Sequence, residues 1–334
     1  MGARRVLKKA LIKVDRQTYR QLLAPMVAFL PAPIAYGVAL LRSDIQFRLS
    51  GDQRRQIKYS LELLFGDRYS PQQRDQIARD CIRNVSCQAI DAVRLLGNGG
   101  ALLGRVEVHG REHLREALAR GKGAVLCSAH FGSERSCFSL VGALGFRISI
   151  IVRRSIESGP RKDKLGKLLY RLRYDYPLST HLHHPTIVRN SRNYGVAVQA
   201  VRVLKKNEFV GTMIDGEVWP GDPSKPMKFD FLNGKAILVP GATMIAQLTG
   251  APVLVVLLRR SPDWRHLILE ISPPIDVKGE PMTAFAQCLA LVDSAIKRHP
   301  DQWTLYWHEL VHLVRLGLVS HDLASHKMWK AVEN

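Results

Sequence analysis

The chain has 334 residues, 46% of them hydrophobic, so it can bury a sizeable core and is too apolar to be disordered over most of its length. Its 49 Lys and Arg residues against 29 Asp and Glu give a net charge of +20, which favours an anionic partner: nucleic acid, an anionic membrane surface or an acidic carrier protein. The five cysteines lack Cys-x-x-Cys spacing, which argues against a disulfide framework or a zinc cluster and indicates reduced thiols.

The first fifty residues combine a basic lead with an apolar run, Leu22 to Leu41, that carries no charge. Roughly 20 apolar residues suffice to cross a bilayer. Three prolines (Pro25, Pro31 and Pro33) and basic residues on both flanks favour a hairpin or an in-plane insertion over a span. We therefore predict a membrane-associating segment over residues 1–48. A cleaved signal peptide and a buried helical pair are the alternatives.

The rest of the chain alternates helical and strand patterns, which predicts an α/β domain over 49–320 with a mainly parallel central sheet sandwiched by helices, followed by a tail over 321–334. Residues 267–271 are expected to pair antiparallel with 253–258, and 216–234 to form a loop over the active site. The expected helices are 52–64, 71–96, 112–119, 194–204, 237–248 and 285–297, and the other expected strands are 106–108, 125–127, 146–152 and 209–214.

The most informative motif is Val125–Glu134, in which an apolar strand ends in small residues followed by His130. Gly132 and Glu134 come next, as in a tight turn leading into a helix. The carboxyl end of a strand is where α/β enzymes place their chemistry, and an acid four residues along a helix can hold an imidazole. The pattern indicates a general base that activates a substrate hydroxyl. The alternative is a half-buried histidine that caps a helix.

Four motifs together resemble the lipid A biosynthesis acyltransferases of the lysophospholipid acyltransferase superfamily: Gly110–Leu114, Gly123–Leu126, Ser128–Gly132 and His299–Trp303. The resemblance runs from about Leu22 to Leu313. It implies an α/β/α sandwich at the cytoplasmic face of the inner membrane. It also implies transfer of an acyl group from an acyl-carrier-protein or coenzyme A thioester to a hydroxyl of a lipid or glycolipid, with no metal or redox cofactor.

On the matching positions, the resemblance makes His130 the base, places Arg153 near anionic or developing oxyanion charge, and matches Asp215 to the family aspartate after a later strand. Gly132 would allow close approach at the helix start. The family acid, however, falls one residue after Glu134, where this chain has Arg135, and one helical residue turns a side chain by about 100°.

Three outcomes are open at this departure. The longer arm of Glu134 restores the contact with His130, or Asp215 or Glu217 replaces it, or the enzyme is impaired and binds lipid instead. We predict the first, with Gly132, Arg135, Arg153, Asp215 and Glu217 contacting substrate.

Two further readings compete with this one. His308-Glu309-x-x-His312 has the pattern of zinc peptidases, but the extended form needs Gly and His where this chain has Arg315 and Leu318. Nucleic-acid binding is permitted by the charge, yet no helix-turn-helix, zinc finger or aromatic-interleaved strand is recognisable. The predicted partners are therefore anionic lipids, the thioester donor and a lipid acceptor, and not nucleic acid.

Overall fold

The computed structural model describes residues 19, 23–95, 100–153, 187–189, 195–216, 227–303, 313–314 and 316–318, and only the backbone of 100–101, 153 and 187–189. Glu217, the His308–His312 pattern and both chain ends, for which the sequence made predictions, lie outside these residues. The predicted domain boundaries near residues 48 and 320 therefore stay predictions.

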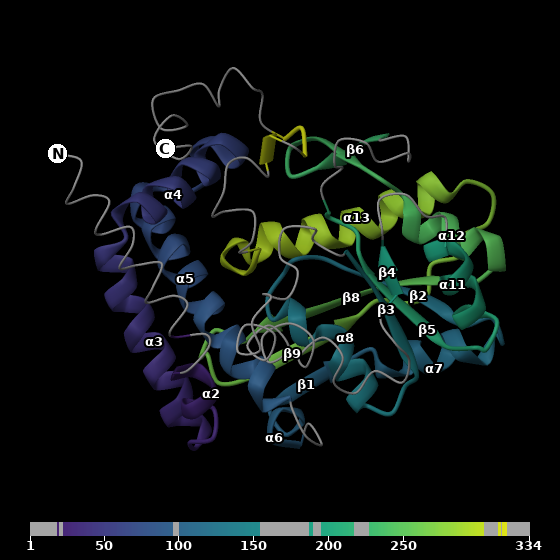
Figure 1. Cartoon of the computed structure of the whole chain (residues 1–334). Helices are drawn as coiled ribbons and strands as arrows, with labels where there is room; N and C mark the ends of the chain where they lie inside the picture. Colours follow the sequence, from purple (N-terminus) through teal and green to yellow (C-terminus); the bar gives the residue numbers. More distant parts are fainter. Residues whose placement is uncertain are drawn as a thin grey trace, which may run out of the picture.

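Helices α2 to α5 form an N-terminal layer beside the sheet, with α3 packed on α5 and lying away from the sheet (Figure 1). The apolar run breaks where its prolines predict, because Pro31 precedes α3. Ser70 and Gln73 form a capping box at the start of α5. The bounds are α2 (Ala24–Val27), α3 (Ala32–Leu49), α4 (Gly51–Phe65) and α5 (Pro71–Arg94).

No helix in the described part of the chain combines the length and the hydropathy needed to cross a bilayer.

The central sheet has seven strands in the order β1-β9-β8-β2-β5-β3-β4. Strands β8, β2, β5, β3 and β4 run parallel to one another, whereas β9 is antiparallel to β8, as predicted, and β1 is parallel to β9. The mixed α/β architecture with a mostly parallel sheet is therefore confirmed. The bounds are β1 (Val106–His109), β2 (Ala124–Ser128), β3 (Ile148–Arg153), β4 (Ile187–Arg189), β5 (Phe209–Met213), β8 (Val253–Arg260) and β9 (Leu267–Ile271).

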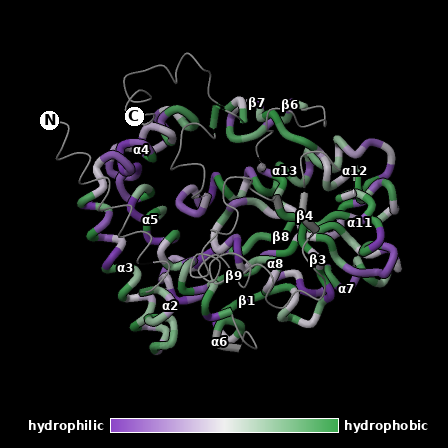
Figure 2. Tube along the Cα trace, in the orientation of Figure 1, coloured by the Kyte–Doolittle hydropathy of each residue, from purple (hydrophilic) through white to green (hydrophobic). Residues whose placement is uncertain are grey.

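Two apolar cores lie on opposite faces of this sheet, because successive strand residues point to opposite sides. Val125 and Cys127 of β2 pack into one core, and Ala124 and Leu126 into the other. The first core contains α11 (Gly195–Leu204), α12 (Gly241–Thr249) and α13 (Pro281–Arg298), and the second contains α7 (Arg111–Ala119) and α8 (Glu134–Ala143). A strand that is buried on both faces is a nearly continuous apolar run, and β8 is apolar from Val253 to Leu258 before it ends in Arg259 and Arg260 (Figure 2).

One stretch differs from the sequence prediction. The expected loop over 216–234 and helix over 237–248 instead contain a two-stranded hairpin, β6 (Met227–Phe231) and β7 (Gly234–Leu238), before α12. Leu232 and Asn233 both have positive φ, the geometry of a tight hairpin turn in which Asn is favoured. Pro240 then precedes the helix, so α12 begins later than expected.

Candidate active site

The sheet brings His130 and Asp215 together although 85 residues separate them. Strands β2 and β5 are parallel neighbours in which Ser128 pairs with Met213, and each side chain follows its strand by two residues. The backbone N–H of Ile214 donates to the carbonyl of Ser128 at 2.8 Å, which extends the pairing to the turn. The pair therefore lies at the carboxyl edge of the sheet, where α/β proteins place ligands.

Asp215 holds His130 through both of its carboxylate oxygens. Its Oδ1 lies 2.9 Å from Nδ1 of the ring, and its Oδ2 accepts the backbone N–H of His130 at 2.9 Å. The Asp215 side chain is fully buried, whereas the His130 side chain is 25% exposed. The contact with Asp215 fixes the orientation of the ring through Nδ1. Proton exchange with a substrate would therefore take place at Nε2.

The charges of the pair raise the basicity of the ring. Burial by itself lowers the pKa of His130, but the charge and hydrogen bond of Asp215 outweigh burial and raise the pKa from 6.5 to about 9. Burial conversely raises the pKa of Asp215, and the adjacent His130 and Trp303 more than offset this and hold it below its usual value. The buried carboxylate is therefore kept ionised beside an imidazole that binds a proton more tightly than usual.

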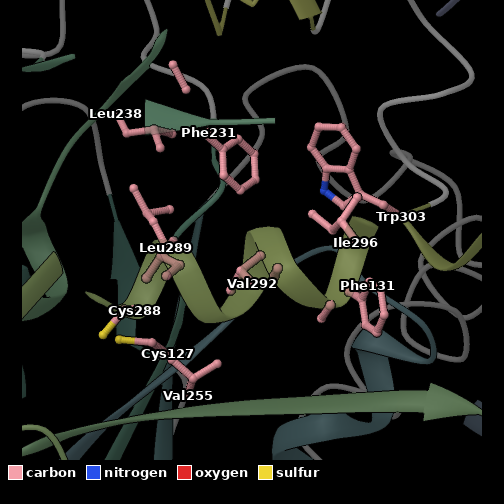
Figure 3. Close-up of a cluster of buried hydrophobic side chains, with 14 of the residues drawn as sticks. Cys127, Phe131, Phe231, Leu238, Val255, Cys288, Leu289, Val292, Ile296 and Trp303 are labelled. Atoms are coloured by element: carbon pink, nitrogen blue, oxygen red, sulfur yellow. The ribbon is translucent and has the colours of Figure 1, made fainter. Parts of the chain in front are cut away.

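Trp303 supplies a third support for Asp215. Its indole N–H donates to Oδ2 at 2.9 Å, while the ring is fully buried and stacks edge-on against Phe231, with centroids 5.8 Å apart. Figure 3 shows the indole beside Phe231 and above Ile296, with its nitrogen on the side that faces Phe231. A buried indole needs a hydrogen-bond partner, and Asp215 is that partner here.

The four backbone N–H groups from His130 to Ser133, in the loop after β2, all donate hydrogen bonds within the protein. The N–H of His130 donates to Asp215, that of Phe131 to Ala129 at 2.7 Å, that of Gly132 to the carbonyl of Gln302 at 2.8 Å, and that of Ser133 to the carbonyl of Leu258 at 2.8 Å. The side chain of Gln88 on α5 donates to the carbonyl of Gly132. This loop is thus anchored by β5, β8, α5 and the segment after α13.

Glu134 does not occupy the place predicted for it, because Asp215 makes the contact that orients Nδ1. Glu134 is the first residue of α8, with its Oε1 4.0 Å from Nε of Arg135. Its Oε2 is buried and has no hydrogen-bond partner among the described residues. Glu134 still acts on His130 through its charge, which raises the pKa of the ring, while the charge of Arg135 lowers it. The second of the three outcomes, with Asp215 as the partner, fits this geometry.

Gly132 allows the loop to approach the backbone of β8 closely. Its φ is +58°, and a Cβ there would lie 2.0 Å from the carbonyl oxygen of Leu258 and 2.8 Å from Cα of Arg259. The space that glycine leaves is therefore filled by β8, and any other residue would push the loop off that strand. Its contact with substrate stays a prediction.

Of the other predicted residues, Arg153 is described by its backbone alone and Glu217 is not described. Arg153 ends β3, and because Ile150 pairs with Gly211 of β5, its backbone lies at the same sheet edge as Asp215. Glu217, His308, Glu309 and His312 lie outside the described residues. Within those residues, no group of three or more His, Cys, Asp or Glu side chains is arranged to hold a metal ion. The five cysteines are buried and free.

Sequence reasoning missed the roles of Gln302 and Trp303. Both belong to the Pro-Asp-Gln-Trp block that carried the family resemblance, yet no local pattern ties them to a histidine more than 170 residues earlier. The only signal was the co-occurrence of the two blocks in one chain. The structure explains why the two blocks occur together. The block around His130 forms the loop, and Gln302 and Trp303 of the other block hold that loop and Asp215 through hydrogen bonds.

The chain was compared with known protein families. The family model of bacterial lipid A biosynthesis acyltransferases matches residues 22–140 and 188–310, which include His130, Asp215 and Trp303. A search of curated proteins found no match.

Proposed function

The chain belongs to the family of bacterial lipid A biosynthesis acyltransferases, and from this premise we propose that His130 is the general base of its acyl transfer to a lipid acceptor. Because the chain belongs to this family, it is an acyltransferase. The observation that carries our proposal is the His130–Asp215 pair at the carboxyl edge of the sheet, with a ring that remains a quarter exposed. The fixed Nδ1 contact leaves Nε2 to accept a proton.

In the proposed reaction, neutral His130 takes the proton of the acceptor hydroxyl on Nε2 while the oxygen attacks the thioester carbonyl. The new C–O bond forms a tetrahedral oxyanion, and its collapse breaks the C–S bond. The imidazolium returns the proton to the departing thiolate. Asp215 stabilises the imidazolium, so its charge favours the state that follows proton abstraction. A positioned base of this kind contributes roughly 10²–10⁴ to the rate.

The remaining predicted residues supply charge. Arg135 on the first turn of α8 and Arg153 at the end of β3 are proposed to face anionic groups of the substrates or the developing oxyanion. The donor is proposed to be an acyl-carrier-protein or coenzyme A thioester, both of which are acidic. No metal or redox cofactor has a place in this sequence of steps.

We place the enzyme on the cytoplasmic face of the inner membrane, with α2 and α3 against anionic lipid. Exposed apolar side chains are concentrated on and between these helices, with Phe29 85% and Met26 71% exposed. The others are Leu23, Leu30, Ile34, Leu41, Ile45 and Leu49. Such a surface together with a net charge of +20 fits an interfacial protein that rests on anionic headgroups.

The activity is tested by lipid mass spectrometry of cells that carry wild type, His130→Ala or no enzyme. We expect an acylated lipid that is present with wild type and absent in the other two. His109→Ala is the matched control, because His109 is exposed on β1 at the far side of the sheet. A product that persists at full level in His130→Ala excludes the ring as base. Lipid binding without any product identifies an impaired enzyme.

Membrane docking is tested separately by flotation with vesicles that contain anionic lipid. Phe29→Ser should lower the bound fraction, whereas Leu248→Ser should not, although Leu248 is 70% exposed on α12. Equal loss in both variants, or none in either, contradicts docking through α2 and α3.

A further inference from the structure

A second buried carboxylate, Asp91 of α5, lies on the other side of the histidine loop. Its side chain is fully buried and pairs with Arg260 at the end of β8, which is also buried. The hydroxyl of Tyr36 on α3 donates to Oδ1 at 2.7 Å, and that of Ser133 donates to Oδ2 at 2.8 Å. Asp91 thus joins α3, α5 and β8 to the residue that precedes α8.

Ser133 is three residues after His130, so its anchoring restricts the path of the loop. The same loop is tied to α5 a second time through Gln88, which donates to the carbonyl of Gly132. Gln302 completes the frame, since its side-chain oxygen accepts the N–H of Arg260 at 3.1 Å and its carbonyl accepts that of Gly132 at 2.8 Å. The loop is therefore fixed between Asp215 on one side and the Asp91 network on the other.

The ion pair between Asp91 and Arg260 suits a support that must not change with conditions. A guanidinium keeps its charge at all accessible pH values, unlike the imidazole that faces Asp215. Burial raises the pKa of Tyr36 well above its usual value, and Asp91 adds to this, so the phenol keeps its proton and remains a donor. Arg260 and Tyr36 therefore each keep one protonation state across the working range.

We propose that Asp91 is a positioning residue: through Ser133 it fixes the loop over 129–133 and so holds the ring of His130 against Asp215. This inference rests on the proposed role of His130, and it adds that the N-terminal helices α3 and α5 are part of the catalytic frame. Tyr36 and the exposed Leu41 and Ile45 all belong to α3. The helix proposed to contact the membrane therefore also contacts Asp91, which is proposed to position the ring of His130.

The test compares two buried serines of the same region. Ser133→Ala removes the bond to Asp91, whereas Ser136→Ala removes a fully buried hydroxyl that has no hydrogen-bond partner among the described residues. For Ser133→Ala we expect kcat to fall about tenfold with little change in KM, the order expected for one hydrogen bond to a charged group. Ser136→Ala should stay within about twofold of wild type, and Ser133→Thr, which retains a hydroxyl, should recover most of the loss.

Titration of His130 by NMR gives a readout that does not depend on turnover. A loosened loop weakens the contact with Asp215, so the pKa of His130 should fall in Ser133→Ala and not in Ser136→Ala. A purely structural serine would lower the melting temperature and leave this pKa unchanged in the folded protein. Equal kcat and equal His130 titration in the two serine variants would overturn the inference.

The two proposals fail in different ways. If wild type transfers no acyl group, the role of His130 falls, and the titration still decides whether Asp91 positions the ring. If His130→Ala abolishes product while Ser133→Ala behaves like Ser136→Ala, the base is right and the positioning role is wrong. Tyr36→Phe, which removes the α3 contact, should shift the His130 titration in the same direction as Ser133→Ala but less, and a shift in the opposite direction would count against the network.

Discussion

Two buried carboxylates, Asp215 and Asp91, lie on either side of the histidine loop and differ in the cation that each one faces. Asp215 faces an imidazole that is a quarter exposed and can lose its proton. Asp91 faces a buried guanidinium that cannot. A buried carboxylate therefore suits the proposed proton transfer where its partner titrates, and suits the proposed support of the loop where its partner does not. Exposure and partner, rather than the acid itself, separate the two roles.

The largest effect should come from Asp215→Asn, which keeps the shape of the side chain and removes its charge. Without the carboxylate the imidazolium is not stabilised, and we expect kcat to fall by about 10²–10⁴. The pKa of His130 should fall from about 9, because only the smaller effect of the Glu134 charge then opposes burial. Steady-state kinetics and NMR titration measure both. Asp230→Asn, at an exposed ion pair on β6, is the control, and a similar loss there would remove the distinction.

Asp91→Ala should lower stability in addition to loosening the histidine loop. It leaves Arg260 buried without its partner, which typically costs about 3–5 kcal/mol of unfolding free energy. Denaturant unfolding measures this loss. The double variant Asp91→Leu with Arg260→Met removes both charges and should recover much of the stability, since a well-packed apolar pair often replaces a buried ion pair. No recovery would mean that the bonds to Tyr36 and Ser133, rather than the charge, dominate.

The His130–Asp215 pair should also make stability depend on pH. The pKa of His130 is raised in the folded protein, from 6.5 to about 9, so the stabilisation is fully present below about pH 6.5 and is lost as the pH rises through about 9. A shift of this size is on the order of 3 kcal/mol. We expect the difference in unfolding free energy between wild type and His130→Gln to shrink over this window. A constant difference would contradict the raised pKa.

The same titration predicts the pH dependence of the rate. The base must be neutral, so kcat/KM should rise with pH and level off near the raised pKa of His130 in the free enzyme. A plateau already reached near pH 6.5 would show that Asp215 does not raise the basicity of the ring.

The smallest effects should come from Glu134 and Arg135, which act on His130 through charge. Glu134→Gln should lower the pKa of His130, and Arg135→Gln should raise it. We expect kcat to change less in Glu134→Gln than in Asp215→Asn, because only Asp215 holds Nδ1. A loss for Glu134→Gln as large as that for Asp215→Asn would restore Glu134 as the orienting acid.

The strands and helices were largely predictable from the sequence because their patterns are local. The five-residue strand Leu267–Ile271 and its antiparallel pairing follow from a mostly apolar run and a short connection. The hairpin over Met227–Leu238 was not predicted, because its turn residues stand in a Gly- and Lys-rich stretch that resembles a loop. Its signal was Asn233, a residue favoured at the positive φ of a tight hairpin turn, whereas Leu232 at the other central position gave none.

The candidate site divides in the same way. His130 was identified because strand, turn and helix signals surround it in one segment. Its acid was predicted to be Glu134 because that residue is near in sequence, whereas Asp215, which contacts Nδ1, is near only in the sheet. Trp303, Gln302 and Asp91 reach the loop through tertiary packing, for which a single sequence carries no pattern. The local pattern of the sequence was enough to identify His130 as the candidate base. Its contact with Asp215 depends on which strands are neighbours in the sheet.

The four N–H groups from His130 to Ser133 each already donate to a protein acceptor. Many acyl-transfer enzymes neutralise the negative oxygen of the tetrahedral intermediate with main-chain donors of this kind. To do so here, the enzyme would have to break contacts that hold the proposed base in place. We therefore expect side-chain cations to stabilise that oxygen, so replacing an arginine at the sheet edge should slow the chemistry even where it leaves substrate affinity intact.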